Sequence, residues 1–281
     1  MSRRAEPQNI ASYYDVTHHL YQVFWSRHGL HYGLWDSDAR NLQEAIRRTD
    51  AFVGERLGLP RGARVLDAGC GVGGTSRTLA HTRGYQLSAV TLSRRQVETA
   101  RRRNRREGVD RLITVEEANF TQLPYADGTF DGVFSVEATC HAEHKIDALR
   151  EYARVLRPGG RLVIVDGFEV DRVLHDHERR DLDAFLLGWE VHSLATPNSF
   201  AQDARAVGLE PKPFEDLTEH VQQTAKHMYR LAQLCYVPVG LPARAGLLPR
   251  RWYEHGMACF AQRRLLAGGG MVYGCLVATK A

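Results

Sequence analysis

The sequence contains few cysteines, and their spacing suits neither disulfides nor a metal site. The five are scattered along the chain without any CxxC pair, at Cys70, Cys140, Cys235, Cys259 and Cys275. An odd number without paired spacing argues against a disulfide framework and against a zinc knuckle. We therefore expect reduced thiols in a protein core.

Long hydrophobic runs are also missing. No stretch approaches the roughly 18 apolar residues of a membrane span, and the first residues, MSRRAEPQNIASYYD, lack the apolar core of a signal peptide. With 281 residues, 43% of them hydrophobic and 25% charged, the composition is that of a globular protein. We expect one large domain in the cytoplasm, with no membrane span.

A strong excess of one charge is the third missing feature. The net charge is +4, and much of the excess lies in the run RRRNRR at 101–106. A nucleic-acid-binding face would interleave aromatic residues with such a run, and no Asn/Asp-Pro-Pro-Tyr/Phe motif for base methylation occurs. We expect no nucleic-acid partner and interpret the run as the solvated end of a helix.

From Arg64 onward, short apolar runs alternate with helical patterns. Helices are expected to start at Thr75 and Ser93, and another is expected to end at the Arg-Pro-Gly-Gly of 157–160. Strands are expected at 63–69, 85–92, 112–118, 130–136 and 161–168. β-branched strands separated by helices indicate βαβ units and a parallel sheet covered on both faces. This predicts a doubly wound α/β fold.

The segments on either side of this alternation predict a helical cover. Apolar residues between Ile10 and Trp25 recur every three or four positions, which predicts an amphipathic helix or two that can fold over a site. Further along, the sequence predicts helices within 171–205, a strand at 207–216 and a last strand at 271–280. We divide the domain into an N-terminal lid (1–60), a cofactor-binding core (61–168) and a substrate lid with the last strands (169–281). The sequence leaves a homodimer open.

A glycine-rich turn follows the first expected strand, in VLDAGCGVGG at 65–74. Glycines there let the backbone bend sharply and let a ligand approach main-chain atoms that any Cβ would shield, so a nucleotide cofactor fits. Gly69, Gly71 and Gly74 satisfy the GxGxxG spacing of dinucleotide-binding proteins. That class requires an acid about 20 residues further on to bind the ribose. The segment AVTLS at 89–93 contains none.

The pattern Asp67-x-Gly69-x-Gly71-x-Gly73 resembles the first motif of class I S-adenosylmethionine-dependent methyltransferases. The resemblance implies a Rossmann-like sheet of seven strands. It also implies S-adenosylmethionine as the cofactor, with the glycine loop around its methionine part. Most of that superfamily has an acid at the end of the second strand, and this chain departs from that pattern.

The segment TLSRRQ, at the end of the second expected strand, resembles a subgroup that contains tocopherol, sterol and cyclopropane-forming fatty acid enzymes. This implies that Thr91, Leu92 and Gln96 contact the cofactor, and Thr91 and Gln96 can hydrogen-bond a ribose without charge. Asn119 and Phe120 match the usual adenine contact, the first for the exocyclic amine and the second for the ring face. Each has an ordinary alternative, as a turn cap or as a core aromatic.

The segment SVEATCHAEH at 135–144 follows the fourth expected strand. Ligands of a doubly wound sheet collect beyond the carboxyl ends of its strands, which places Glu137 near the transferable methyl group. Glu137, His141 and His144 are spaced i, i+4 and i+7, which is one face if the segment is helical. A zinc site lacks an obvious fourth ligand, so we expect no metal. The ordinary alternative is a Glu137 that caps a helix and a buried, satisfied His141.

EATCHA also resembles the EATCHAP signature of sterol C24-methyltransferases, and the aromatic segment 13–25 is similar to their N-terminal region. The likeness covers roughly residues 10–170. Glu143 stands in place of the proline, and the chain is shorter than typical sterol enzymes. The resemblance therefore points to smaller isoprenoids, including prenyl diphosphates. A diphosphate would need arginines or a divalent ion near the lid, to which Arg172, Arg179, Arg180 or Asp176 could contribute.

These resemblances imply methylation of an alkene carbon. An alkene is a weak nucleophile that must be positioned, and its attack leaves a carbocation that aromatic faces can stabilise. We predict Glu137 as cation stabiliser or base, with His141 as its orienting or relay partner. Tyr14 is expected at the cofactor, and the substrate contacts are expected from an aromatic pool of Tyr21, Trp25, Tyr32 and Trp189, with Phe24 and Trp35. The alternative is O-, N- or ring C-methylation of a phenolic or amine natural product, with His141 as base.

Overall fold

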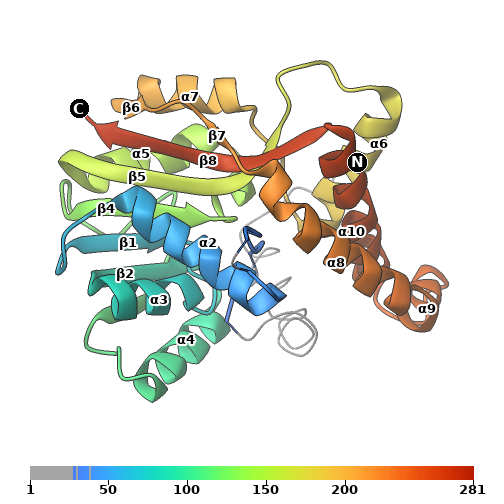
Figure 1. The fold of residues 1–281 in the computed structure, drawn as a ribbon, viewed down its shortest axis with the longest axis horizontal. Coiled ribbons are helices and arrows are strands. Elements are labelled where there is room, and N and C mark those ends of the chain that lie inside the picture. Colours follow the sequence, from blue (N-terminus) through green and yellow to red (C-terminus); the bar gives the residue numbers. More distant parts are fainter. Residues whose placement is uncertain (1–27, 30, 38) are drawn as a thin grey trace.

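The computed structural model describes residues 28–29, 31–37 and 39–281, and its centre is a twisted sheet (Figure 1). Its strands are β1 (Arg64–Ala68), β2 (Gln86–Thr91), β3 (Ile113–Glu117), β4 (Phe130–Val136), β5 (Leu156–Glu169), β6 (Leu209–Pro211), β7 (Glu215–Asp216) and β8 (Met271–Lys280). Seven of them follow the order β3-β2-β1-β4-β5-β8-β6, and the two-residue β7 also pairs with β8. Neighbours from β3 to β5 are parallel, whereas β8 is antiparallel to each of its partners.

Helices cover both faces of this sheet, as the alternation in the sequence predicts. They are α2 (Leu42–Leu57), α3 (Gly74–Arg83) and α4 (Arg94–Arg106) on one face, and α5 (Lys145–Val155) and α7 (Pro197–Ala206) on the other (Figure 1). Successive strand residues divide between two cores, so that Val163 packs with the first group and Ile164 with the second. A period of two with both sets buried is typical of a covered parallel sheet. The doubly wound α/β fold is confirmed.

A helical cap stands beside the sheet (Figure 1). It consists of α6 (Asp176–Trp189), α8 (Thr218–Cys235), a π-helical turn η2 (Tyr236–Gly240), α9 (Leu241–Arg244) and α10 (Arg250–Gly268). α10 packs against both α6 and α8. The helices predicted within 171–205 are thus present as α6 and α7, whereas those expected between Ile10 and Trp25 lie outside the described residues. In the part of the chain that the structure describes, no helix is long and apolar enough to cross a membrane.

The two ends of α4 agree with the sequence. Ser93 Oγ accepts a hydrogen bond from the backbone N–H of Gln96 at 3.2 Å, which makes Ser93 the N-cap. The basic run occupies the last turns, where positive charge is stabilised by the helix dipole. Arg101 turns back onto the sheet and donates to the carbonyl of Val115 at 2.6 and 3.0 Å.

The expectation of one strand at 207–216 is wrong, because the segment forms β6 and β7 with a break between them. Pro213 has no N–H to donate to a ladder, and the ring of Phe214 packs against Phe168 with centroids 5.1 Å apart. The helix end before 157–160 is correct, since α5 stops at Val155. The Arg-Pro-Gly-Gly itself lies at the start of β5, next to a shift in its register with β4.

Candidate active site

The turn between β1 and α3 adopts a backbone geometry that favours glycine. Gly69, Gly71 and Gly73 have φ angles of 98°, 52° and 74°, in the region that L side chains rarely occupy. A Cβ on Gly69 would collide with the side chain of Ala138, whereas a Cβ on Gly71 would meet only Nε2 of Gln96, at 3.9 Å. The bare backbone of Gly71 therefore faces open space, as in a loop that receives a ligand.

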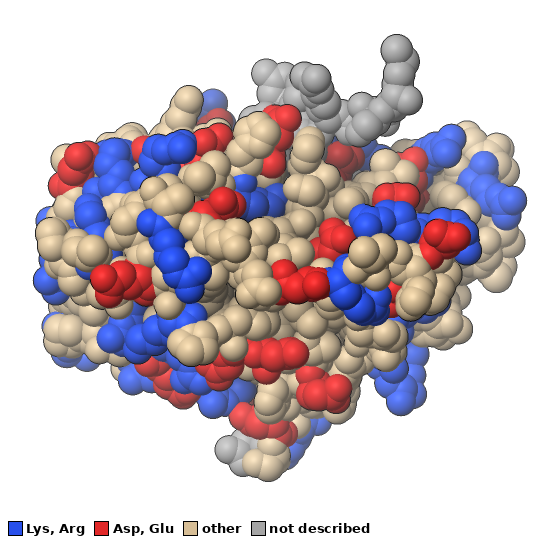
Figure 2. Space-filling view, turned by 90° about the horizontal axis from the view of Figure 1, so that it is seen from above, with Lys and Arg blue, Asp and Glu red and all other residues tan. Residues whose placement is uncertain are grey.

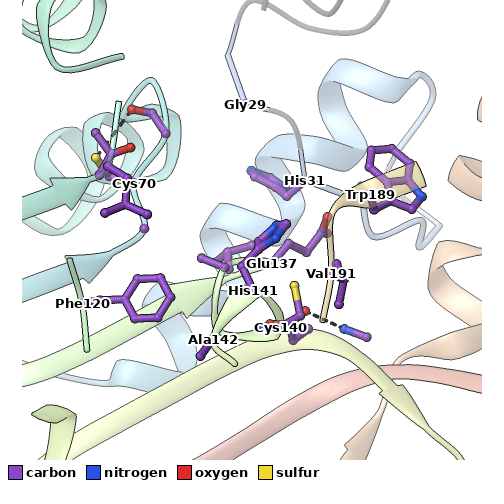
Figure 3. Close-up of a pocket in the computed structure, with 18 of the residues that line it drawn as sticks. Gly29, His31, Cys70, Phe120, Glu137, Cys140, His141, Ala142, Trp189 and Val191 are labelled. Atoms are coloured by element: carbon purple, nitrogen blue, oxygen red, sulfur yellow. Dashed lines mark hydrogen bonds between the residues drawn. The ribbon is translucent and has the colours of Figure 1, made fainter. Parts of the chain in front are cut away.

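This loop forms one wall of a cavity of about 370 Å³ (Figure 3). The other walls come from the carboxyl ends of β2, β4 and β5, and from α6, α8, α10 and β8. The predicted site residues that line it are Tyr32, Asp67, Gly69, Gly71, Thr91, Leu92, Gln96, Asn119, Phe120, Glu137, His141 and Trp189. Gly73 does not line it, and serves as the N-cap of α3. Tyr14, Tyr21 and Trp25 lie outside the described residues.

The end of β2 offers uncharged polar groups in place of an acid. Thr91 Oγ1 donates to Gln96 Oε1 at 2.6 Å, and both side chains line the cavity. The amide of Gln96 keeps its N–H donors and the hydroxyl of Thr91 keeps lone pairs. The pair can therefore bind ribose hydroxyls, which stays a prediction for both residues.

Asn119 and Phe120 combine the two roles considered for them. Asn119 Oδ1 accepts from the N–H of Thr121 at 3.0 Å, which is a turn cap. The ring of Phe120 belongs to the core, with its centroid 6.1 Å from that of Tyr152. Both residues nevertheless line the cavity, and Figure 3 shows the Phe120 ring on the side of the glycine loop. An aromatic face in this position can stack on a flat base.

Glu137 is held at the end of β4 in a left-handed conformation, with φ of 49°. Its N–H donates to the carbonyl of Val165 at 2.8 Å. Its Oε1 accepts from the N–H of Tyr32 at 2.6 Å and from the hydroxyl of Tyr273 at 2.7 Å. Burial raises the pKa of Glu137 to about 7, against the charge of His31 and those two hydrogen bonds, which lower it. The carboxyl can therefore gain or lose a proton near neutral pH.

The prediction that Glu137, His141 and His144 share a helix face is wrong. The segment is a turn, in which Thr139–His141 forms a short 3-10 helix (η1) and α5 begins only after His144. Glu137 continues the sheet through its N–H and then takes a positive φ, which a helix does not accept. Its carboxyl bonds to distant segments, so it is not a helix cap either.

His31 places a positive charge beside Glu137. Its Nδ1 donates to the carbonyl of Tyr32 at 2.9 Å, and its Nε2 lies 3.2 Å from Asp50 Oδ1. Burial alone lowers the pKa of His31, but the hydrogen bond and charge of Asp50 raise it to about 9. Asp50 is fully buried in α2 and lies 2.6 Å from Nε2 of His28 as well. The sequence carries no signal for this pair, because only the fold brings α2 to His31.

His141 lies next to Glu137 at the centre of the cavity (Figure 3). Its Nδ1 bonds to the carbonyl of Glu190 at 3.2 Å, which assigns the hydrogen to Nδ1 and the lone pair to Nε2. Burial lowers the pKa of His141 to about 4. The ring is therefore neutral near pH 7 and chemically able to accept a proton. Its role as a relay partner of Glu137 stays a prediction.

Four further acids line the cavity: Asp166 from β5, Asp67 from β1, Glu143, and Asp147 from α5. Asp166 accepts from the N–H groups of Cys140 and Gly167, both at 2.9 Å, and burial raises its pKa to about 6. Asp67 accepts from Ser76 at 2.6 Å, and burial raises its pKa to about 7. Among the described residues, no lysine or arginine lines the cavity. The excess of acids over lysines and arginines in the cavity wall favours a ligand that carries positive charge.

The wall opposite the glycine loop is largely apolar. It consists of Trp189 and Val191, on the far side of Glu137 in Figure 3, together with Phe185, Leu194, Met228 and Met271. Tyr32 and Tyr273 add aromatic faces, with ring centroids 5.0 Å apart. Trp35 donates to Thr224 Oγ1 at 2.8 Å and does not line the cavity. It is therefore no longer a candidate for contacting the substrate. This wall suits a small, largely apolar ligand.

Tyr273→Phe is expected to raise the pKa of Glu137 above about 7. The hydroxyl of Tyr273 donates to the ionised carboxyl and lowers its pKa, so removal of the hydroxyl lets the carboxyl keep its proton to higher pH. Carbon-13 NMR of the Glu137 carboxyl measures this without any substrate. Tyr32→Phe is the matched control, because the buried Tyr32 hydroxyl has no hydrogen-bond partner in residues 28–29, 31–37 and 39–281. Equal titration curves for the two variants would contradict the assigned contact.

Comparison with known proteins identifies the family. Residues 66–164 match the model of a methyltransferase domain. Over 239 residues the chain is 34% identical to the sarcosine/dimethylglycine N-methyltransferase of Halorhodospira halochloris, a match that covers 82% of this chain and 82% of that protein. This chain is a class I S-adenosylmethionine-dependent methyltransferase.

The methyltransferase is also similar to a sterol enzyme and to a cyclopropane synthase. It is 36% identical over 214 residues to the 24-methylenesterol C-methyltransferase 2 of Oryza sativa subsp. japonica, covering 73% of this chain and 56% of that one. The structure of the cyclopropane synthase MmaA2 from Mycobacterium tuberculosis has the same fold, with a TM-score of 0.84 at 18% identity over 98% of each chain. The resemblance indicated by the glycine motif and by EATCHA is confirmed.

The cavity of the methyltransferase fits its cofactor, S-adenosylmethionine. The open backbone at Gly71 leaves room for a ligand, and the acidic lining suits a positive sulfur. Thr91 and Gln96 offer uncharged partners to a ribose. When bound, the cofactor supplies an electrophilic methyl group. In the described part of the chain, no three His, Cys, Asp or Glu side chains are grouped to hold a metal ion.

Proposed function

We propose that this methyltransferase transfers the methyl group to an alkene carbon of a small isoprenoid-like acceptor, through a carbocation. The observation that carries the proposal is the position of Glu137. Its carboxyl, with a pKa of about 7, lies between the glycine-loop side of the cavity and an apolar wall. An alkene needs no base before transfer, but the cation that it leaves needs a base afterwards in a pocket that excludes water. The sterol C-methyltransferase relative supports the same reaction class.

The proposed reaction balances in atoms and charge. The electron pair of the alkene forms the bond to the methyl carbon as the bond to sulfur breaks, and that second pair stays on sulfur. The positive charge passes to the neighbouring carbon of the acceptor. Glu137 then removes a proton from an adjacent carbon, and the electrons of that C–H bond form the new alkene. The charge that the sulfur loses thus ends on the proton held by Glu137.

The surroundings of Glu137 support a cationic intermediate on the acceptor. Aromatic faces of Tyr32, Tyr273 and Trp189 line the cavity, and each cation–π contact in a desolvated site can contribute about 2 kcal/mol. Positioning of the weak nucleophile against the methyl group can contribute more, about 7–11 kcal/mol. The charge of His31 is compensated by buried Asp50, so this pair adds little net charge to the pocket.

The acceptor that these residues support best has no diphosphate. Arg172, which the sequence made a candidate for binding one, is paired with Glu178 at 2.6 Å. Arg179 lies 3.4 Å from Glu169, and neither arginine lines the cavity. The described residues therefore offer a diphosphate no lysine or arginine inside the cavity, the charge of His31 is taken up by Asp50, and acids would repel it.

N- or O-methylation is the second candidate, and two observations favour it. The Halorhodospira halochloris relative is named as an N-methyltransferase. In addition, His141 lies beside Glu137 in the cavity and its low pKa keeps the ring neutral, so that it can accept a hydrogen bond from an amine or a phenol. In this reading Glu137 attracts a cationic acceptor and removes no proton from carbon.

A trideuteromethyl-labelled cofactor distinguishes the two candidates. The enzyme is incubated with a panel of unphosphorylated terpenoid alkenes, prenyl diphosphates, sarcosine-type amines and phenols. The proposal predicts a labelled methyl on carbon in the terpenoid arm, located by NMR, with one alkene retained in the product. A label on nitrogen or oxygen replaces the proposal with the second candidate, and a preference for prenyl diphosphates contradicts the acceptor class.

A further inference from the structure

The end of the helical cap exposes an unusual amount of apolar surface. Of the seven large apolar side chains that are exposed in the described residues, five lie between positions 234 and 248. They are Leu234 at 77%, Val237 at 68%, Leu241 at 43%, Leu247 at 79% and Leu248 at 39%. We name residues 234–251 the α9 tip. It joins the end of α8 to the start of α10, and Figure 1 shows α9 at the extremity of the cap, away from the sheet.

The sequence around the α9 tip carries charge of one sign. No aspartate or glutamate occurs from 220 to 253, whereas that stretch contains Lys226, Arg230, Arg244, Arg250 and Arg251. Arg250 and Arg251 are within 4 Å of acids, Glu254 at 3.0 Å and Glu190 at 3.9 Å. Arg230 and Arg244 are exposed. Figure 2 shows blue and uncharged surface at this end of the molecule, with red side chains beside some of the blue ones.

Exposed leucines beside an excess of cations match a surface that is apolar inside and negative outside. Contiguous apolar surface on a water-exposed protein usually marks a binding site. The interface of a bilayer that contains anionic lipids offers both acyl chains for the leucines and headgroups for the arginines. A second copy of this chain would instead place the same positive charges opposite each other. The tip is short, so it would lie in the interface and would not span the bilayer.

We propose that the α9 tip attaches this enzyme peripherally to a membrane surface rich in anionic lipid. The proposal goes beyond the methyl transfer and does not depend on the identity of the acceptor. The tip is nevertheless connected to the site, because α8 and α10 extend from it and contribute Met228 and Gln262 to the cavity. Attachment by the tip therefore brings the cap, and with it the apolar side of the cavity, toward the lipid.

Sedimentation with vesicles tests the attachment. Vesicles of phosphatidylcholine with a minor share of phosphatidylglycerol are compared with phosphatidylcholine alone, at low and at physiological salt. The full chain should bind the anionic vesicles more tightly than phosphatidylcholine vesicles, by at least about fivefold for each basic residue near the membrane surface. Salt should weaken the binding to anionic vesicles. Leu234→Ser combined with Leu247→Ser should reduce it by at least about tenfold, because two apolar side chains no longer leave water. Arg230→Gln combined with Arg244→Gln should remove the preference for anionic lipid.

Val173→Ser is the matched control, since Val173 is 88% exposed but lies outside the α9 tip. It should bind vesicles like the unaltered chain. Unchanged affinity for S-adenosylmethionine in every variant shows that the fold is intact. Failure of the unaltered chain to bind anionic vesicles overturns the proposal, as does equal binding by the double-leucine variant. If the chain instead sediments as a dimer that the leucine substitutions dissociate, and no vesicle binding is seen, the tip is a contact between copies of this chain.

Discussion

Glu137→Gln is expected to lower kcat by about two to four orders of magnitude while the dissociation constant of S-adenosylmethionine changes little. The amide keeps the shape of the side chain, and its oxygen can still accept the hydrogen bonds from Tyr32 and Tyr273. It cannot take a proton, and it places no negative charge beside a carbocation. Single-turnover kinetics with the accepted substrate measure the chemical step, and titration calorimetry measures cofactor binding.

Glu143→Gln is the matched control for this prediction. Glu143 belongs to the same EATCHAEH segment and lines the same cavity, but its side chain is 54% exposed, with His192 at 3.7 Å. A substitution at such a position usually changes free energies by no more than about 0.5 kcal/mol, so kcat should stay within a factor of about two. Turnover that survives in Glu137→Gln, or that falls equally in both variants, would remove Glu137 from the chemical step.

The pH dependence of the same reaction gives Glu137 a second signature. In the free enzyme its pKa is about 7, so kcat/KM should rise through neutral pH as the carboxyl ionises. A positive charge in the cavity favours the ionised carboxyl and lowers its pKa. The rise of kcat with pH reports the enzyme with substrate and cofactor bound. This rising limb should therefore lie at lower pH than the rising limb of kcat/KM, which reports the free enzyme. Glu137→Gln should abolish both limbs, and limbs that persist in this variant would assign them to another group.

The core of the fold could be predicted because each of its parallel strands is a short apolar run bounded by turn signals. The glycine turn after β1 and the N-cap Ser93 before α4 depend only on residues close in sequence, and both are found where the sequence predicts them. The strand expected at 207–216 failed because Pro213 and the packed ring of Phe214 interrupt it. The helical face at Glu137 failed because spacing alone cannot reveal a positive φ.

Motifs in the sequence located the cofactor side of the cavity, whereas the other side was predictable only where one rule of sheet architecture applies. That rule, which places ligands beyond the carboxyl ends of strands, finds Glu137, and it could equally have found Asp166 near the end of RLVIVDGF. Tyr273 could not be found this way. It lies inside the antiparallel β8, and only the register that sets it opposite Gly167 brings its hydroxyl to Glu137. The ion pair of His31 with Asp50 likewise depends on tertiary packing.

Gly71→Ala is expected to weaken the binding of S-adenosylmethionine by about 10- to 100-fold, with a small loss of stability. The φ of 52° at Gly71 costs an L residue about 1–2 kcal/mol. Within the protein the new methyl group meets no clash, since Gln96 Nε2 lies 3.9 Å from it. The methyl group instead occupies space on the cavity side, where a ligand must approach the backbone. Overpacking of that kind costs about 1–3 kcal/mol, which corresponds to the stated change in affinity.

Gly62→Ala separates the ligand effect from the backbone effect. Gly62 has a φ of 84°, and a Cβ there also meets no neighbour, but the residue does not line the cavity. Both variants should lose a similar free energy of unfolding, because each places an L residue at positive φ. Only Gly71→Ala should lose cofactor affinity, measured by calorimetry on the purified chain. If the two variants bind S-adenosylmethionine equally well, the cofactor does not lie against Gly71. The placement of its methyl group near Glu137 would then lose its support.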